Sequence, residues 1–198
     1  MNASPTKRRI IVALTGASGA CYGVRLLQIL AQTPNIETHL IVSIAAWRNI
    51  AIECRESPAE IEALADHVHA IDDVGACIAS GSFRASGMVI APCSMHTLAS
   101  IAHGLDDNLI TRAADVTLKE RRRLLLLVRE SPLHLTHLRN MVSATEAGAI
   151  VCPPMPAFYL RPTSLADIVD QGVARLLDLL EIEHSLASRW TGECQTRG

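Results

Sequence analysis

The feature that most constrains the fold of this chain is a short, uninterrupted apolar run that recurs and ends each time in a polar turn. Residues 10–14, 88–91 and 124–128 have this form. Runs of this length without polar alternation are typical of strands buried on both faces of a parallel sheet. Apolar residues at helical spacing follow the turns, so the chain consists of strand–turn–helix units. We therefore expect a doubly wound α/β fold.

The rest of the chain continues this alternation. Residues 38–43 form a further predicted strand, and residues 149–151 form a short last one. The alanines from Ala45 onward are interpreted as a turn. Helical patterns cover residues 24–30, 58–67, 98–102, 109–123, 135–147 and 165–182. Because no repeat or change in composition divides the chain, we expect a single domain over residues 1–198, with flexible tails at 1–8 and 191–198.

Charge and cysteine content narrow the class of protein. The formal net charge is −2 and there is no basic tract, which argues against nucleic acid and anionic membranes as partners. No segment is long enough to span a bilayer, and no signal-peptide pattern is present. The six cysteines form no C-x-x-C pair and no metal-ligand spacing with histidine. We expect a cytoplasmic protein with reduced thiols and no metal.

Small polar residues follow the predicted strands, at the edge where ligands bind in such sheets. Residues 15–20 read Thr-Gly-Ala-Ser-Gly-Ala, Ser43 ends the second strand, and Ser94 to Thr97 follow the third. The first loop, with two glycines ahead of a helix, suits a mononucleotide phosphate. A tight turn without a ligand uses the same residues, and each serine also suits a helix cap. Three such loops at one edge of the sheet favour a ligand-binding site over tight turns and helix caps alone.

Charged residues surround the strand at residues 124–128. Arg129 and Glu130 follow it directly, at the carboxyl end of a buried strand. Arg112 and Lys119 lie seven residues apart, two helical turns, so both can face one anion. We expect these two cations and Arg129 to hold a phosphate ester. The arginines at 121–123 are interpreted as a solvated run, and Cys93 as a small buried side chain rather than a reactive thiol.

Several longer motifs together resemble one known family. They are T-G-A-S-G-A at 15–20, A-P-C-S-M-H-T-L-A at 91–99, D-N-L-I-T-R-A-A-D at 107–115, L-K-E-R-R at 118–122, R-E-S-P-L at 129–133, H-L-R-N-M at 137–141 and P-P-M-P-A-F-Y at 153–159. In this order and spacing, from about Arg9 to Trp190, the chain resembles the UbiX/Pad flavin prenyltransferases.

The resemblance implies a flavodoxin-like Rossmann subunit and a metal-independent enzyme. Its expected reaction joins the dimethylallyl group of dimethylallyl monophosphate to N5 and C6 of reduced FMN. The product, prenylated FMN, would serve a UbiD-type decarboxylase. The family usually assembles as a dodecamer with the site at a subunit interface. Whether the prenyl donor is a mono- or a diphosphate stays open at this point.

The same resemblance implies roles for individual residues. It assigns proton movement to Ser18, Glu53 and Glu130, although Glu130 can instead simply pair with an arginine. It assigns FMN contacts to Gly16, Ala17, Ser18, Ser43, Ser94, Met95, His96, Thr97 and Arg129. It assigns the prenyl phosphate to Arg112, Lys119, Arg129, Tyr159 and Arg175. Ile44, His96 and His103 depart from the residues usual in the family.

Two other functions fit the predicted fold. An FMN-dependent cysteine decarboxylase should carry the motif P-A-S-A-N-T near residues 92–97, where this chain reads Pro-Cys-Ser-Met-His-Thr. A non-catalytic flavin-binding regulatory subunit would leave Arg112, Lys119, Glu130 and Tyr159 without a role. We therefore rank both below the prenyltransferase.

Overall fold

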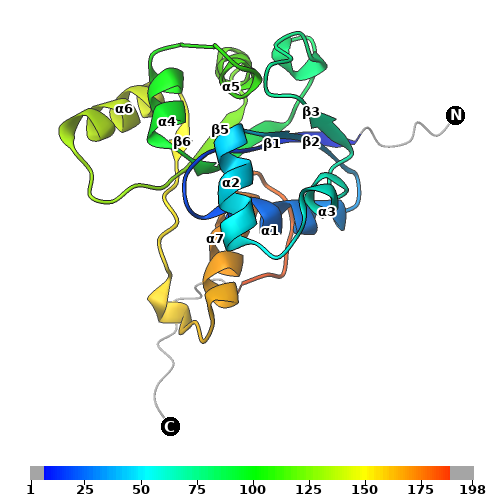
Figure 1. Cartoon of the computed structure of the whole chain (residues 1–198), viewed down its shortest axis with the longest axis vertical. Coiled ribbons are helices and arrows are strands. Elements are labelled where there is room, and N and C mark those ends of the chain that lie inside the picture. The colour runs from blue at the N-terminus through cyan, green and yellow to red at the C-terminus, as the bar shows by residue number, and fades with distance from the viewer. Residues whose placement is uncertain (1–6, 188–198) are drawn as a thin grey trace, which may run out of the picture.

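A six-stranded parallel sheet organises the chain in this computed structural model, which describes residues 7–187 (Figure 1). The spatial order of the strands is β3-β2-β1-β4-β5-β6, so the direction of winding reverses between β1 and β4. The strands are β1 (Arg8–Leu14), β2 (Ile36–Val42), β3 (His67–His69), β4 (Gly87–Cys93), β5 (Arg123–Val128) and β6 (Ile150–Val151). The predicted doubly wound α/β fold is confirmed.

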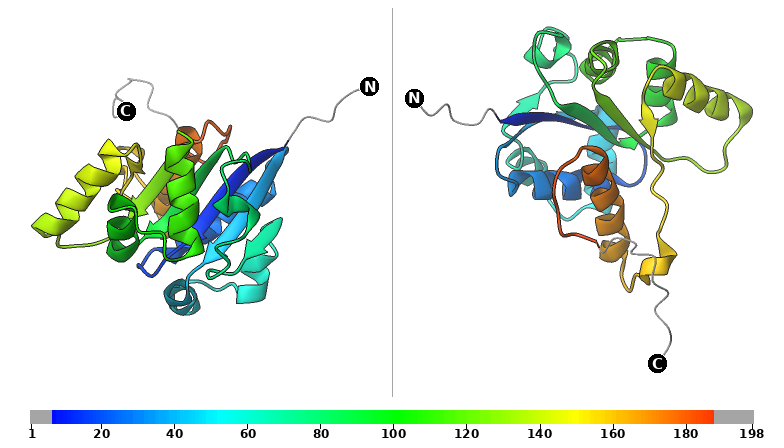
Figure 2. Two further views of the ribbon diagram at one scale, coloured as in Figure 1. Left: turned by 90° about the horizontal axis from the view of Figure 1, so that it is seen from above. Right: turned by 180° about the vertical axis from the view of Figure 1, so that it is seen from behind.

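Helices cover both faces of the sheet. They are α1 (Ala20–Ala31), α2 (Ile44–Glu53), α3 (Pro58–Glu62), α4 (Met95–Ala102), α5 (Leu109–Lys119), α6 (Leu135–Glu146) and α7 (Leu165–Leu179), with 3₁₀ turns η1 (Cys77–Ala79) and η2 (Phe158–Leu160). Figures 1 and 2 show α1, α3 and α7 on one face and α4, α5 and α6 on the other.

The hydrophobic core has two halves, because successive residues of a strand point to opposite faces. Ile10 and Val12 of β1 pack in the half beneath α1 and α7, whereas Ile11 and Ala13 pack in the half beneath α4 and α5. All four side chains are buried. This explains why the strand has an unbroken apolar run. No helix within residues 7–187 combines the length and the apolar character needed to cross a bilayer.

Two elements were not predicted. The supposed turn at Ala45 is helix α2, which begins where the Ala46 amide donates to the Ser43 hydroxyl at 3.1 Å. The helix predicted over residues 58–67 ends at Glu62, and His67 opens the edge strand β3. Both have weak apolar signals. Helix α2 buries only two residues of its own, and β3 is a three-residue strand with largely exposed side chains.

The ends of several elements also differ from the prediction. β1 begins at Arg8, which was expected to lie in a flexible tail. The Arg8 guanidinium donates to the backbone oxygens of Leu180 and Glu181, at 2.7 and 2.8 Å, and so ties the first strand to the end of α7. Helix α5 ends at Lys119 rather than at residue 123, because Arg123 already belongs to β5. The tail predicted at 191–198 lies outside the described residues.

Candidate active site

Hydrogen bonds join the loops that follow three neighbouring strands, β2, β1 and β4. The buried Thr15 hydroxyl donates to the Pro92 carbonyl at 2.8 Å and accepts from the Ser94 amide at 2.8 Å. The Ser43 amide donates to the Leu14 carbonyl at 3.0 Å. These loops form one rim, named here the switch-point rim, at the position where the strand order reverses. Doubly wound proteins bind their nucleotides at this position.

The serines of the rim are helix caps, as one of the two sequence interpretations had it. The Ser94 hydroxyl accepts from the Thr97 amide at 3.2 Å, and Ser43 caps α2 in the same way. A cap satisfies only some of the amides of a first helical turn, so others remain available at each helix start. Met95 is half-buried and His96 is exposed there, while Thr97 is buried.

Gly16 lies where the first loop meets the start of α2. A Cβ atom at this position would lie 2.5 Å from the Ala45 Cβ, closer than real side chains approach. The loop backbone therefore contacts the neighbouring helix start directly, with no side chain between them. Ala17 is buried and Ser18 is exposed, so the Ser18 hydroxyl faces the solvent side of the rim.

The Glu53 carboxylate binds the start of α1. Its Oε2 accepts from the Gly19 and Ala20 amides, both at 2.8 Å. The sequence suggested that these amides, with the helix dipole, hold a mononucleotide phosphate, but here they hold a carboxylate of the chain itself. Glu53 thereby lies beside the residue that follows Ser18, so two of the residues predicted for proton movement come together. Glu53 also lines a cavity of about 520 Å³ between α1 and α7.

Arg129 and Glu130 extend the rim beyond β5. The Arg129 amide donates to the Cys93 carbonyl at 3.2 Å. The side chains of Arg129 and Glu130 are exposed. The Glu130 carboxylate accepts from the Ser131 amide at 3.0 Å. Within residues 7–187 of the single chain, no arginine forms an ion pair with Glu130.

Arg112 and Lys119 are each paired with carboxylates close to them in the sequence, and Lys119 does not converge with Arg129 within one chain. The Arg112 guanidinium pairs with Asp106 at 3.0 Å and Asp115 at 3.1 Å, and the Lys119 ammonium pairs with Glu120 at 2.8 Å. Lys119 lies just before β5 and Arg129 just after it. Because a strand rises about 3.3 Å per residue, these two positions are roughly 20 Å apart. A single subunit therefore does not assemble the predicted phosphate cluster.

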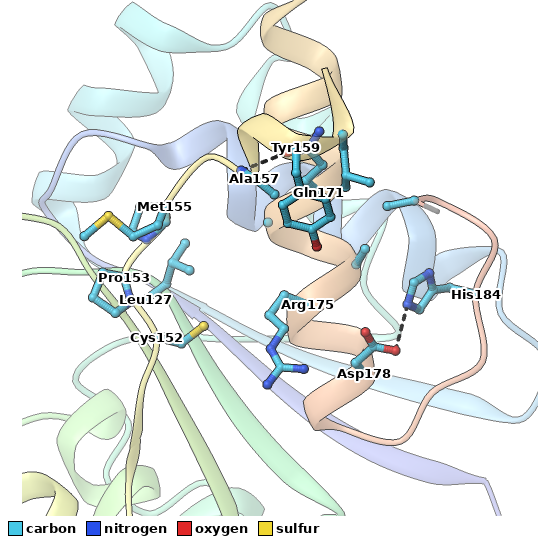
Figure 3. Close-up of a pocket in the computed structure, with 15 residues that line it drawn as sticks. Leu127, Cys152, Pro153, Met155, Ala157, Tyr159, Gln171, Arg175, Asp178 and His184 are labelled. Atoms are coloured by element: carbon cyan, nitrogen blue, oxygen red, sulfur yellow. Dashed lines mark hydrogen bonds and ion pairs between the residues drawn. The ribbon is translucent and has the colours of Figure 1, made fainter. Parts of the chain in front are cut away.

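Tyr159 and Arg175 do come together, in a second cavity of about 400 Å³ (Figure 3). Both side chains point into this cavity, Tyr159 from η2 and Arg175 from α7. The Ala157 amide donates to the Gln171 side chain at 3.2 Å, which holds the proline-rich segment against α7. The structure therefore brings together two of the residues that the family resemblance assigned to the prenyl phosphate. No carboxylate within the described part of the chain forms an ion pair with Arg175.

The sequence interpretation did not single out Thr15 or Gln171, although these two side chains join the parts of the site. A buried threonine directly after an apolar strand was the available signal for Thr15. Gln171 offered none, because its partner Ala157 lies on a different element and only the folded chain brings them together.

The cysteines near these cavities do not provide a nucleophile. Burial raises the pKa of Cys93, which is completely enclosed, so the expected role as a buried side chain is confirmed. Burial, with the neighbouring Cys21, Glu56 and Glu53, raises the pKa of Cys54 to about 11. At neutral pH both are protonated thiols, which are weak nucleophiles.

Comparison with known proteins first defines the class. Residues 2–191 match the family described as Flavoprotein, so this doubly wound fold with its switch-point rim is that of a flavoprotein. The flavin prenyltransferase UbiX of Thauera aromatica is 54% identical over 93% of this chain and 94% of its own. The chain belongs to the UbiX family of flavin prenyltransferases, and it is an enzyme of that class.

Two solved structures are similar over the whole fold. A crystal structure of AnUbiX in complex with FMN and dimethylallyl pyrophosphate has a TM-score of 0.92 and 51% identity, covering 94% of this chain and 99% of that one. A dodecameric FMN-dependent UbiX-like decarboxylase from Escherichia coli O157:H7 has a TM-score of 0.91 and 50% identity, covering 93% and 100%. The flavodoxin-like prediction is thereby confirmed.

Proposed function

We propose that this enzyme joins a dimethylallyl group to N5 and C6 of reduced FMN, with dimethylallyl monophosphate as the donor. The observation that carries this proposal is the switch-point rim, where Thr15 joins the loops after β1 and β4. AnUbiX, which shares this fold at 51% identity, binds FMN and a dimethylallyl donor.

The rim fits a flavin mononucleotide in its chemistry. Gly16 brings the first loop directly against the start of α2, because an added Cβ would lie 2.5 Å from the Ala45 Cβ. The starts of α2 and α4 offer amides, and Ser18 and Arg129 offer an exposed hydroxyl and guanidinium. We assign FMN to Gly16, Ala17, Ser18, Ser43, Ser94, Met95, His96, Thr97 and Arg129.

We propose that two or more subunits complete the prenyl-phosphate site. Its five assigned residues do not gather in one chain: Tyr159 and Arg175 share a cavity, but Lys119 lies at the opposite end of β5 from Arg129, and Arg112 is paired with Asp106 and Asp115. Large apolar side chains are exposed on α6, among them Leu135 at 60% and Val142 at 57%, and such patches mark contact surfaces. The UbiX-like relative from Escherichia coli O157:H7 is dodecameric. A dodecamer of this chain is therefore the assembly we propose.

The protein's own contribution to the reaction is positioning and charge. Reduced FMN supplies a nucleophilic N5, so the site needs only to align the allylic carbon with it. As the N5–C bond forms and the C–O bond breaks, phosphate leaves with the electron pair, and Lys119, Arg129 and Arg175 stabilise its charge. Closing the bond to C6 needs one proton delivered to the alkene and one removed from the ring, which we assign to Glu130, with Ser18 and Glu53 assisting.

We further propose that the prenylated FMN passes to a UbiD-type decarboxylase and that the enzyme works in the cytoplasm. The first rests on the family. The second rests on the sequence, whose cysteines show no disulfide framework.

Anaerobic incubation of the purified protein with reduced FMN and dimethylallyl monophosphate or diphosphate tests the reaction. Mass spectrometry should find prenylated FMN, formed faster from the monophosphate. A cysteine-containing peptide with oxidised FMN is the parallel assay for a cysteine decarboxylase, and we expect no decarboxylated product. Absence of saturable FMN binding would refute the whole proposal. FMN binding without turnover in either assay would instead favour a regulatory flavin-binding subunit.

A further inference from the structure

A cluster of potential metal ligands lies at the β2–β3 edge of the sheet, outside the site described above. The parallel register pairs His39 with His67 and Ile41 with His69, which brings the three histidines together. The His39 ring stacks on the other two, with centroid distances of 4.6 and 5.2 Å. The turn η1 places Cys77 beside them. The spacing along the sequence gave no sign of this cluster, because β3 was not predicted.

One set of three donor atoms has the size of a metal site. His39 Nδ1 and His69 Nε2 share a hydrogen bond at 2.9 Å, which a metal ion between them would replace, and both lie within 4.8 Å of the Cys77 sulfur. Zinc bonds of about 2.0–2.1 Å to nitrogen and 2.3 Å to sulfur place tetrahedral ligands roughly 3.3–3.7 Å apart. Cys77 is exposed, so its side chain can move the remaining distance.

A carboxylate already orients the central histidine. Glu37 Oε1 lies 3.1 Å from His39 Nε2 and 2.9 Å from Arg9 Nε. When Nε2 donates its hydrogen to Glu37, the lone pair on Nδ1 points toward His69 and Cys77. Metal-bound histidines are usually held by a carboxylate in this way.

We propose that His39, His69 and Cys77 bind a divalent transition-metal ion of the zinc class, with water as the fourth ligand and Glu37 orienting His39. Two imidazoles and a thiolate are donors that such ions prefer. Ser43 of the switch-point rim lies four residues further along β2, roughly 13 Å away, so the ion takes no part in prenyl transfer. It links η1 and the short edge strand β3 to β2.

A second set, Glu37, His39 and His67, also falls within 4.8 Å. It is the poorer site, because the Glu37 carboxylate already pairs with Arg9. In addition, His67 Nε2 lies 4.0 Å from Glu37 Oε1. The two sets share only His39 as a ligand. Cys77 and His69 belong only to the proposed site, and His67 belongs only to this one.

Cobalt titration of the full-length protein, after EDTA treatment and desalting, tests the proposal. We expect one equivalent to bind with a thiolate-to-cobalt charge-transfer absorption band. Cys77→Ser should abolish the band, and His69→Gln should weaken binding. Glu37→Gln should weaken it about 10–100-fold, the usual cost of losing an orienting carboxylate. Cys54→Ser, which removes a half-buried thiol elsewhere, is the matched control and should bind as the parent does.

The results for these variants distinguish the two sets of metal ligands, and FMN binding serves as a control for folding. No saturable cobalt binding, or a charge-transfer band that survives in Cys77→Ser, would overturn the proposal. So would binding lost in His67→Gln but kept in Cys77→Ser. Each variant should take up FMN like the parent, which shows that it is folded. EDTA treatment should leave the prenyl-transfer rate unchanged.

Discussion

Glu130 is exposed directly beyond β5, and its carboxylate is held only by the neighbouring Ser131 amide within the described residues. A carboxylate can accept a proton and return it during a reaction. Glu130→Gln keeps the size of the side chain but cannot do so. We expect normal FMN binding and a loss of about 10²–10⁴-fold in the rate of ring closure.

Anaerobic mixing followed by mass spectrometry and absorbance would measure this step. The variant should form the adduct at N5 and stall before the bond to C6. Glu62→Gln, at the exposed end of α3, is the control and should react at the parent rate. A Glu130→Gln enzyme that completes the cyclised product at the parent rate would exclude the proton-transfer role.

Gly16 offers a test of the flavin site by steric means. An added Cβ would lie 2.5 Å from the Ala45 Cβ, so Gly16→Ala must push the first loop away from α2. Overpacking of this kind costs about 1–3 kcal/mol. We expect the FMN dissociation constant, measured by flavin fluorescence, to rise at least tenfold. At Gly75 the nearest atom to an added Cβ is 3.5 Å away, so Gly75→Ala should bind FMN normally.

At the scale of the elements, helix starts on the switch-point rim carry both stability and function. Ser94 caps α4 at the rim, and Ser57 caps α3 away from it. Replacing either with alanine should lower the free energy of unfolding by about 0.5–2 kcal/mol, as measured by urea titration. Only Ser94→Ala should also weaken FMN binding. Equal FMN affinity in both variants would mean that Ser94 only caps the helix and does not contribute to FMN binding.

The elements that the sequence predicted are those with strong apolar patterns. β1, β4 and β5 are buried on both faces, so their runs contain almost nothing polar. Helix α2 and strand β3 were not predicted, because neither buries a continuous stripe of apolar side chains. Ser43 was the available signal for α2, since it was interpreted as a possible helix cap, but the alanines after it were interpreted as a turn. The polar residues at the strand ends predicted the switch-point rim. The hydrogen bonds by which Thr15 joins two of its loops could not be predicted, because they depend on which strands are neighbours in space.

At the scale of the whole molecule, the sequence placed Arg112 and Lys119 with Arg129 in one phosphate site. Their seven-residue spacing along α5 predicted that both face one anion, but spacing contains no information about the carboxylates that pair with them. Asp106, Asp115 and Glu120 occupy these cations in the single chain. Which residues of neighbouring subunits meet is a property of the assembly, and no pattern within one chain specifies it.

Mixed assemblies test whether subunits share the site. Lys119→Ala and Glu130→Gln should each abolish most activity alone. When the two variants are co-expressed in equal amounts and assemble at random, about a quarter of the sites should combine an intact Lys119 with an intact Glu130 from different subunits. Prenylated FMN formation should therefore recover to about a quarter of the parent rate. No recovery would mean that both residues act from the same subunit.

The separation of Lys119 and Glu130 by the length of β5 also has a consequence for gene dosage. A subunit damaged at both positions would spoil two sites, its own and that of a neighbour. In a cell that makes damaged and intact copies equally, about three quarters of the sites would then fail, instead of the half expected for self-contained subunits. Loss of function in this enzyme would behave as partly dominant, although each chain folds around its own sheet.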